Sequence, residues 1–164
     1  MPDGVLDQRY SDPEAEAVPW EVVRERLARA GVYWLTTVRP EGRPHVTPLI
    51  AVWLDGAMLF TAGAEERKAR NLTGNPAVAL TTGTDALDRG LDVVVEGEAV
   101  VLRDDATLRR AAASWEAKYG EAWRFEVRDG AFHHAGGAAD VYRVAPRVVF
   151  AFGKDPYSQN RYTF

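Results

Sequence analysis

The sequence has no cysteine among its 164 residues. A disulfide framework, a zinc–thiolate finger and a thiol nucleophile are therefore excluded. There is also no apolar run of about 18 residues, the length needed to cross a membrane, and the start of the chain lacks the basic and apolar layout of a signal peptide. Together these absences lead us to expect a cytoplasmic protein that does not enter a membrane.

Serine, histidine and excess positive charge are scarce as well. None of the three serines lies in a Gly-x-Ser-x-Gly motif, so the usual nucleophile of a serine hydrolase is missing. His133 and His134 are adjacent and face opposite sides of an extended chain, which does not predict a metal site. The net charge of −4 argues against general binding to nucleic acid, so any anion site must be local.

Two segments have the apolar spacing of amphipathic helices. The first covers residues 19–31, from Pro19 to Gly31, and the second starts at an acidic cap near residue 104 and ends at Gly120. A shorter helix is predicted at about residues 65–72. The sequence therefore predicts two or three helices.

Most of the remaining chain is typical of short strands. Branched and aromatic residues alternate with polar ones, Asp55-Gly56 is a hairpin signal, and Gly97 indicates a bulge or a barrel corner. The expected strands are residues 32–39, 45–54, 57–62, 78–82, 91–102 and 140–152. Six or seven strands with a few helices predict an α+β fold whose antiparallel sheet closes on itself, since closure removes exposed edges.

The chain is long enough for one domain. Residues 1–18 carry several acidic residues and prolines and few large apolar groups, so they bury too little surface to offset their ordering entropy. We expect a flexible tail at 1–18 and a single domain at 19–164.

One stretch, residues 59–72, could carry chemistry. A strand passes through a Gly63 loop into a helix whose first turns hold Arg67, Lys68 and Arg70, where free backbone N–H groups and the helix dipole favour an anion. The alternative is a solvated helix face, because Glu65 and Glu66 offset these charges. In a helix the three cations cannot all point one way, so Arg67 or Arg70 is expected to be surplus and Lys68 to reach the anion.

This strand–loop–helix succession and the preceding strand at residues 44–49 resemble the pyridoxamine 5′-phosphate oxidase-like split β-barrel family. In that family a flavin phosphate rests on an Arg-Lys pair, here Arg67 and Lys68. The ending at residues 150–164 is similar to the branch that binds the deazaflavin coenzyme F-420, and Arg-Asn-Leu at 70–72 points the same way.

The resemblance implies a homodimer with the flavin between two subunits. The ring would lie along one strand, with the ribityl chain near a second, and the last residues of the chain would approach from the dimer mate. The implied cofactor-binding residues are His45, Val46, Thr47, Pro48, Thr61, Arg67, Lys68, Arg70, Asn71, Gln159 and Arg161. For His45, the residues alone leave open a proton donor or a purely structural histidine.

The expected function is hydride transfer from reduced coenzyme F-420 to a small organic substrate. Because the flavin ring carries that chemistry, the lack of an obvious general acid or base does not exclude an enzyme. One alternative is an FMN-binding pyridoxamine-phosphate-oxidase-like protein, although residues 47–54 lack the Arg and Lys with which those oxidases contact their flavin. Another is a non-catalytic binder of a flavin or haem.

Overall fold

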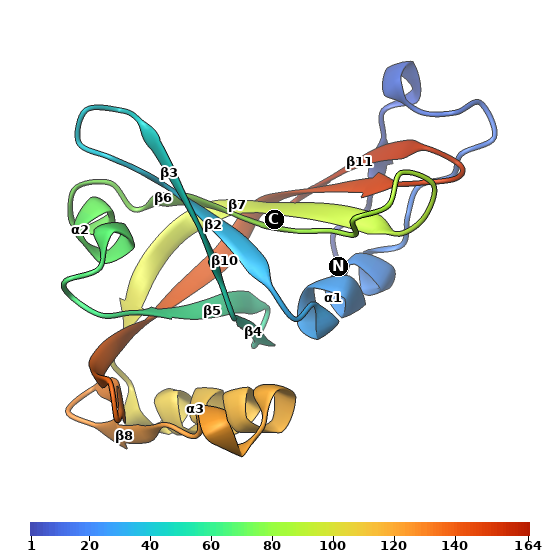
Figure 1. The fold of residues 1–164 in the computed structure, drawn as a ribbon. Helices are drawn as coiled ribbons and strands as arrows, with labels where there is room; N and C mark the ends of the chain where they lie inside the picture. Colours follow the sequence, from blue (N-terminus) through green and yellow to red (C-terminus); the bar gives the residue numbers. More distant parts are fainter.

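The computed structural model describes all residues, 1–164, and forms eleven strands, three α-helices and two short 3-10 helices (Figure 1). In chain order the elements are β1 (Val5–Leu6), η1 (Gln8–Tyr10), α1 (Trp20–Arg29), β2 (Tyr33–Val38), β3 (Pro44–Leu49), β4 (Val52–Leu54), β5 (Ala57–Ala62), α2 (Arg67–Gly74), β6 (Ala77–Thr82), β7 (Leu91–Leu102), α3 (Asp105–Tyr119), η2 (Glu121–Trp123), β8 (Glu126–Arg128), β9 (Ala131–His134), β10 (Gly137–Gly153) and β11 (Ser158–Thr163). The α+β class is confirmed.

The structure has more strands than the six or seven expected. The predicted strand at 45–54 is divided into β3 and β4, and residues 126–134 and 158–163 form the further strands β8, β9 and β11. Glycine-rich and polar stretches carry a weak strand pattern, but their backbone groups still pair where a neighbouring edge is free. None of the helices is long and apolar enough to cross a bilayer.

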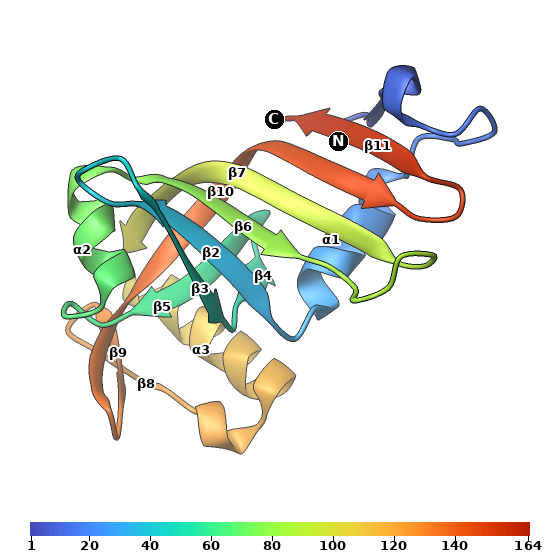
Figure 2. The ribbon, with the colours of Figure 1, turned by 45° about the horizontal axis from the view of Figure 1, so that its top comes forward.

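The 17-residue strand β10 determines how the sheet divides. Its first residues, Gly137–Ala139, pair with β9. From Val141 to Gly153 one edge follows β7, whereas the other pairs with β5, at Asp140–Val144, and then with β11, at Val148–Gly153. The change of partner coincides with a register shift between Pro146 and Val148. The sheet therefore splits into two curved parts that share β7 and β10, as Figure 2 shows.

Gly97 of β7 lies where the two parts diverge. A Cβ atom on this residue would lie 2.5 Å from the carbonyl oxygen of Ala145, too close for any side chain. The bulge or corner expected at Gly97 is confirmed by the register shift opposite it.

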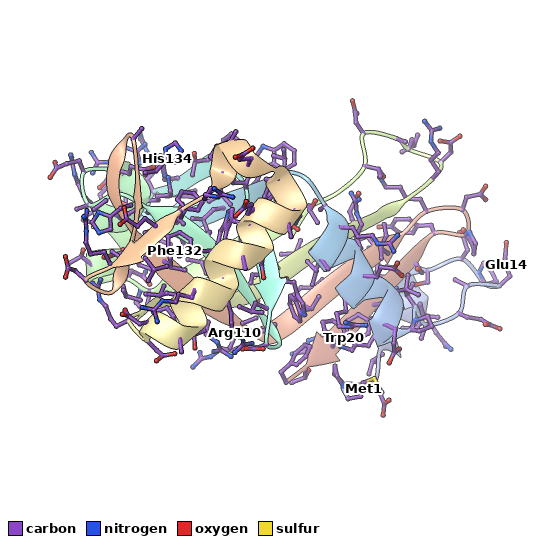
Figure 3. The ribbon with its side chains drawn as sticks, turned by 90° about the horizontal axis from the view of Figure 1, so that it is seen from below. Met1, Glu14, Trp20, Arg110, Phe132 and His134 are labelled. Carbon is purple, nitrogen blue, oxygen red and sulfur yellow. The ribbon has the colours of Figure 1, made fainter.

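Two apolar cores hold the fold together. The larger lies inside the barrel and includes Val23 and Leu27 of α1. The smaller lies under α3, where Trp115 meets Phe132 edge-on at 5.5 Å between ring centroids. Seen from below in Figure 3, α3 covers this part of the sheet, with Phe132 beneath it and His134 at the end of β9. Ala69 and Leu72 of α2 also belong to the larger core, which packs this helix against the sheet.

The expected flexible tail at residues 1–18 needs correction, because this segment is docked on β11. Val5 and Leu6 pair antiparallel with β11, and the backbone N–H of Asp7 donates to the carbonyl of Gln159 at 2.8 Å. The N–H of Val18 donates to the Asn160 side chain at 2.9 Å. Composition misleads here because backbone groups on a free sheet edge pair with any sequence.

Candidate functional site

The strand–loop–helix unit around α2 forms as predicted. β5 is buried along most of its length, and the chain leaves it at Gly63 and begins α2 at Arg67. Glu66, the residue before the helix, accepts a hydrogen bond from the Gly63 N–H at 2.8 Å. This contact fixes the loop, so that the start of α2 has a defined place beside the end of β5.

Buried polar contacts attach α2 to the sheet. Asn71 is 2% exposed, and its Nδ2 donates to Oγ1 of Thr37 on β2 at 2.9 Å. Thr37 in turn pairs with His45 across the β2–β3 ladder. In Figures 1 and 2, α2 accordingly lies at the same end of the sheet as the tip of the β2–β3 hairpin. Helix and hairpin together form the candidate site.

The three predicted cations of α2 have different surroundings. Arg70 is exposed and contacts Glu65 at 3.3 Å, whereas the buried ammonium of Lys68 contacts the Glu66 carboxylate. Arg67 is exposed at the first helical position and pairs with no carboxylate. Of the two residues expected to be surplus, the geometry therefore favours Arg70. Lys68, expected to reach the anion, is already held by Glu66.

A fourth cation, Arg39, belongs to the same end of the molecule and escaped the sequence analysis. It follows β2, is half-buried and pairs with no carboxylate. Alternation along the strand could have indicated it, because Arg39 has the same parity as the inward-facing Thr37.

Several buried polar atoms at this end have no hydrogen-bond partner within the chain. They are Nε of Arg39, Nδ1 of His45 and Oδ1 of Asn71. Buried polar groups are normally paired, and leaving one unsatisfied costs about 1–3 kcal/mol. Three such atoms on neighbouring elements are therefore an indication of a bound partner.

The surroundings of His45 disfavour the charged form of its imidazole. Desolvation lowers the pKa of its imidazole below the ordinary value of 6.5. The positive charges of Arg39, Arg67 and Lys68 lower this pKa further. Cations from both the hairpin and the helix therefore act on one imidazole, which shows that they share a positive local field.

The other residues predicted to bind the cofactor lie on three strands, β3, β5 and β11. His45 and Thr47 are half-buried, whereas Val46 and Pro48 lie on the exposed outer face of β3. Thr61 pairs with Val141 of β10 and shares its strand face with Leu59, toward the core under α3. The structure brings His45, Arg67, Lys68 and Asn71 together, but not Thr61.

Gln159 and Arg161 lie far from this group within one chain. Both belong to β11, which Figure 2 shows at the opposite end of the sheet from α2. They border a hollow of about 300 Å³ together with Phe150 and Phe152 of β10. A single copy therefore does not join them to the α2 site.

Comparison with known proteins shows the family of this chain. The model of the family described as pyridoxamine 5′-phosphate oxidase matches residues 19–152. The chain belongs to the pyridoxamine 5′-phosphate oxidase family. No curated protein sequence matches it.

Solved structures of this family's fold resemble the chain at low sequence identity. A conserved hypothetical protein from Mycobacterium tuberculosis is 21% identical, with a TM-score of 0.69 over 87% of this chain and 89% of the other. An FAD-binding protein from Mesorhizobium loti is 18% identical, with a TM-score of 0.61 over 90% and 96%. The heme storage protein HutZ from Vibrio cholerae is 21% identical, with a TM-score of 0.58 over 77% and 87%. These similarities support the split-barrel fold.

The residues beside α2 fit the phosphate group of a flavin. Arg67 offers a free guanidinium at the start of the helix, where backbone N–H groups also favour an anion. The unpaired buried atoms of Arg39 and His45 lie on the adjoining hairpin. This end of the family fold therefore has charge and hydrogen-bonding groups that the chain itself leaves unused.

Proposed function

We propose that this family member is an oxidoreductase that uses reduced coenzyme F-420 to transfer hydride to a small organic substrate. The observation that carries the proposal is the group of unpaired polar atoms and cations between α2 and the β2–β3 hairpin. The similarity of residues 150–164 to the deazaflavin-binding branch supports this cofactor. When bound, the deazaflavin ring supplies the hydride.

The chain's own residues bind and orient in this proposal. Arg67 and the first N–H groups of α2 hold the phosphate, while Glu66 keeps Lys68 and the Gly63 loop in place. Asn71 fixes the helix against β2 through Thr37. Neutral His45 faces the bound molecule as a hydrogen-bonding group that adds no charge.

The proposed site is completed by a second copy of the chain. The outer face of the sheet exposes Trp34 (44%) and Val46 (56%), and Phe150 and Phe152 are only half-buried there. A contiguous apolar face of this kind is a liability on a monomer. In a homodimer it would be covered, and β11 of one copy, with Gln159 and Arg161, would approach the α2 site of the other.

A second candidate keeps the site and changes the cofactor to FMN. Arg39 and Arg67 are two cations without carboxylate partners, which matches the charge of about −1.5 to −2 on a phosphomonoester at neutral pH. The similarity to an FAD-binding protein and to a heme storage protein also motivates a third candidate, a binder without turnover.

Parallel equilibrium titrations with coenzyme F-420 and FMN test these candidates, followed by anaerobic assays of hydride transfer with the bound, reduced cofactor. The proposal predicts tighter binding of F-420 and turnover of a conjugated organic acceptor. Tighter binding of FMN would replace the cofactor, and binding without turnover of any acceptor would support the third candidate. A protein that binds neither flavin would contradict the first two.

A further inference from the structure

Arg39 is fixed by its backbone but not by its side chain. Its N–H donates to the carbonyl of Arg43 at 2.9 Å, and its own carbonyl accepts from the N–H of Gly42 at 2.8 Å, closing the β2–β3 turn. The side chain is half-buried, its Nε is shielded from solvent, and it has no partner. The fold thus holds the start of this side chain in place and leaves its charged end free to bind.

The strand geometry places Arg39 toward α2. Residues of one parity along β2 face the interior, as buried Leu35 and Thr37 show, and Arg39 continues that series. Thr37 contacts Asn71 of α2 at 2.9 Å. Because Arg39 is two residues beyond Thr37 on the same face, its guanidinium lies on the hairpin side of the candidate site.

The charges around His45 place Arg39 and Arg67 in one local field. Both cations disfavour protonation of this imidazole, although one belongs to the hairpin and the other to the helix. Neither is neutralised by an acidic side chain, unlike Lys68 and Arg70. Two unneutralised cations on facing elements repel each other until an anion lies between them.

Arginine is suited to this role because its planar guanidinium presents several N–H donors to the oxygens of a phosphate. The unpaired Nε of Arg39 is one such donor, already removed from water. The two terminal guanidinium nitrogens of Arg39 are not buried and make no hydrogen bond, so they are the donors that a phosphate can reach first.

We propose that Arg39 is a second anion-binding residue, which holds the cofactor's phosphate from the β2–β3 hairpin while Arg67 holds it from α2. This inference rests on the proposed function, because it assigns a residue to that same site. A phosphate held from both sides would fix the position of β3 relative to α2. This matters because the flavin ring would lie along β3.

The test is Arg39→Gln, with Arg43→Gln as the matched control and Arg67→Gln as the reference. Arg43 is an exposed arginine of the same turn without an ion pair. Affinities for F-420 and FMN are measured in low salt by fluorescence titration. We expect Arg39→Gln to weaken binding of the preferred flavin roughly ten- to hundredfold, and Arg43→Gln to change it less than about twofold.

The outcomes separate the inference from the function it rests on. If Arg67→Gln weakens binding but Arg39→Gln does not, the inference is overturned and the proposed function stands. If neither variant weakens binding, the phosphate site itself is wrong. Should Arg39→Gln fail to fold, Arg39→Lys keeps the positive charge but lacks the planar guanidinium. Wild-type affinity in that variant would overturn the role of the guanidinium.

Discussion

Two cationic regions at opposite ends of the sheet differ in how many hydrogen-bond partners the chain gives them. At the β10–β11 turn, Lys154 is 11% exposed, contacts Asp92 at 2.9 Å, and donates to the carbonyls of Thr84 and Ala86 at 3.1 and 2.6 Å. Its three N–H donors all have acceptors within the chain. At the α2 end, Arg39 and Arg67 have no carboxylate, and buried atoms of three residues have no partner.

The difference indicates that the β10–β11 end serves the fold, and it is consistent with the ligand site proposed at the α2 end. A buried cation surrounded by acceptors fixes neighbouring loops, and its loss leaves other groups unsatisfied. A cation that lacks partners adds little to stability and is available to an anion. Charge content alone does not distinguish these regions, whereas the pattern of satisfied hydrogen bonds does.

The largest expected effect is at the β10–β11 turn, where all the N–H donors of Lys154 have acceptors. Asp92→Ala would leave Lys154 without its counter-charge and should lower the free energy of unfolding by about 2–3 kcal/mol, with flavin affinity unchanged. Asp88→Ala removes an exposed ion pair with Arg89 in the same loop and should cost less than about 0.5 kcal/mol. Chemical denaturation measures both, and equal stability of the two variants would break the comparison.

At the α2 end the expected effect is on binding. Arg67→Gln should weaken flavin affinity roughly ten- to hundredfold and leave the unfolding midpoint nearly unchanged. Arg70→Gln, on the same helix but paired with Glu65, should alter affinity only slightly. Isothermal titration with both variants checks the pair. A larger loss from Arg70→Gln would mean that the free cation has been assigned to the wrong residue.

Removal of residues 1–13 tests whether the N-terminal segment contributes to the stability of the β10–β11 end of the sheet. Deletion would expose the edge of β11 and remove the hydrogen bonds that the N–H groups of Asp7 and Asp12 donate to the carbonyls of Gln159 and Tyr157. We expect a loss of about 1–2 kcal/mol in the free energy of unfolding, since each such bond contributes about 0.5–1.5 kcal/mol. A truncated protein with unchanged stability would show that this docking contributes nothing.

Lys118 gives an intermediate case that pH can test. Its ammonium donates to the Tyr33 hydroxyl and the Ala51 carbonyl at 2.9 and 2.8 Å, but it has no carboxylate, and burial lowers its pKa to about 8. Between pH 8 and the unfolded value of 10.5 the unfolded chain holds more protons. Stability should therefore rise with pH in this window and level off below about pH 8, where Lys118 is protonated in both states.

We expect a gain of about 1–2 kcal/mol between pH 8 and 9.5, before the tyrosines titrate. The Lys118→Met variant should lack this rise, which denaturation at a series of pH values can measure. A parallel rise in the variant would assign the effect to other groups.

Much of the fold followed from local patterns in the sequence. Apolar spacing predicted α1 and α3, and Gly97 marked the point where the sheet diverges, because these signals depend on neighbours in the chain. β1 and β11 were missed because their strand character comes from edge pairing between distant segments. No local pattern shows that pairing.

The candidate site was predictable in part for the same reason. The cations at residues 67–70 lie in one short segment, so the helix and its charge could be predicted from the sequence. Arg39 was missed because its proposed role depends on the hairpin meeting α2, and the pairing of Lys68 with Glu66 depends on the shape of the loop. Val46 and Pro48 shared the predicted strand, but only the register shows that they face outward.

The most direct test of the central claim compares each flavin with its phosphate-free form. The affinity for FMN is compared with that for riboflavin, and the affinity for coenzyme F-420 with that for the same deazaflavin lacking the phosphate and the groups beyond it. Both comparisons are made with the wild-type protein and with Arg67→Gln. Unused donors at α2 predict that the phosphate-bearing form of the preferred flavin binds at least about tenfold more tightly, and that this advantage shrinks in Arg67→Gln and in high salt. Equal affinity of the two forms for the wild-type protein in low salt would contradict the account.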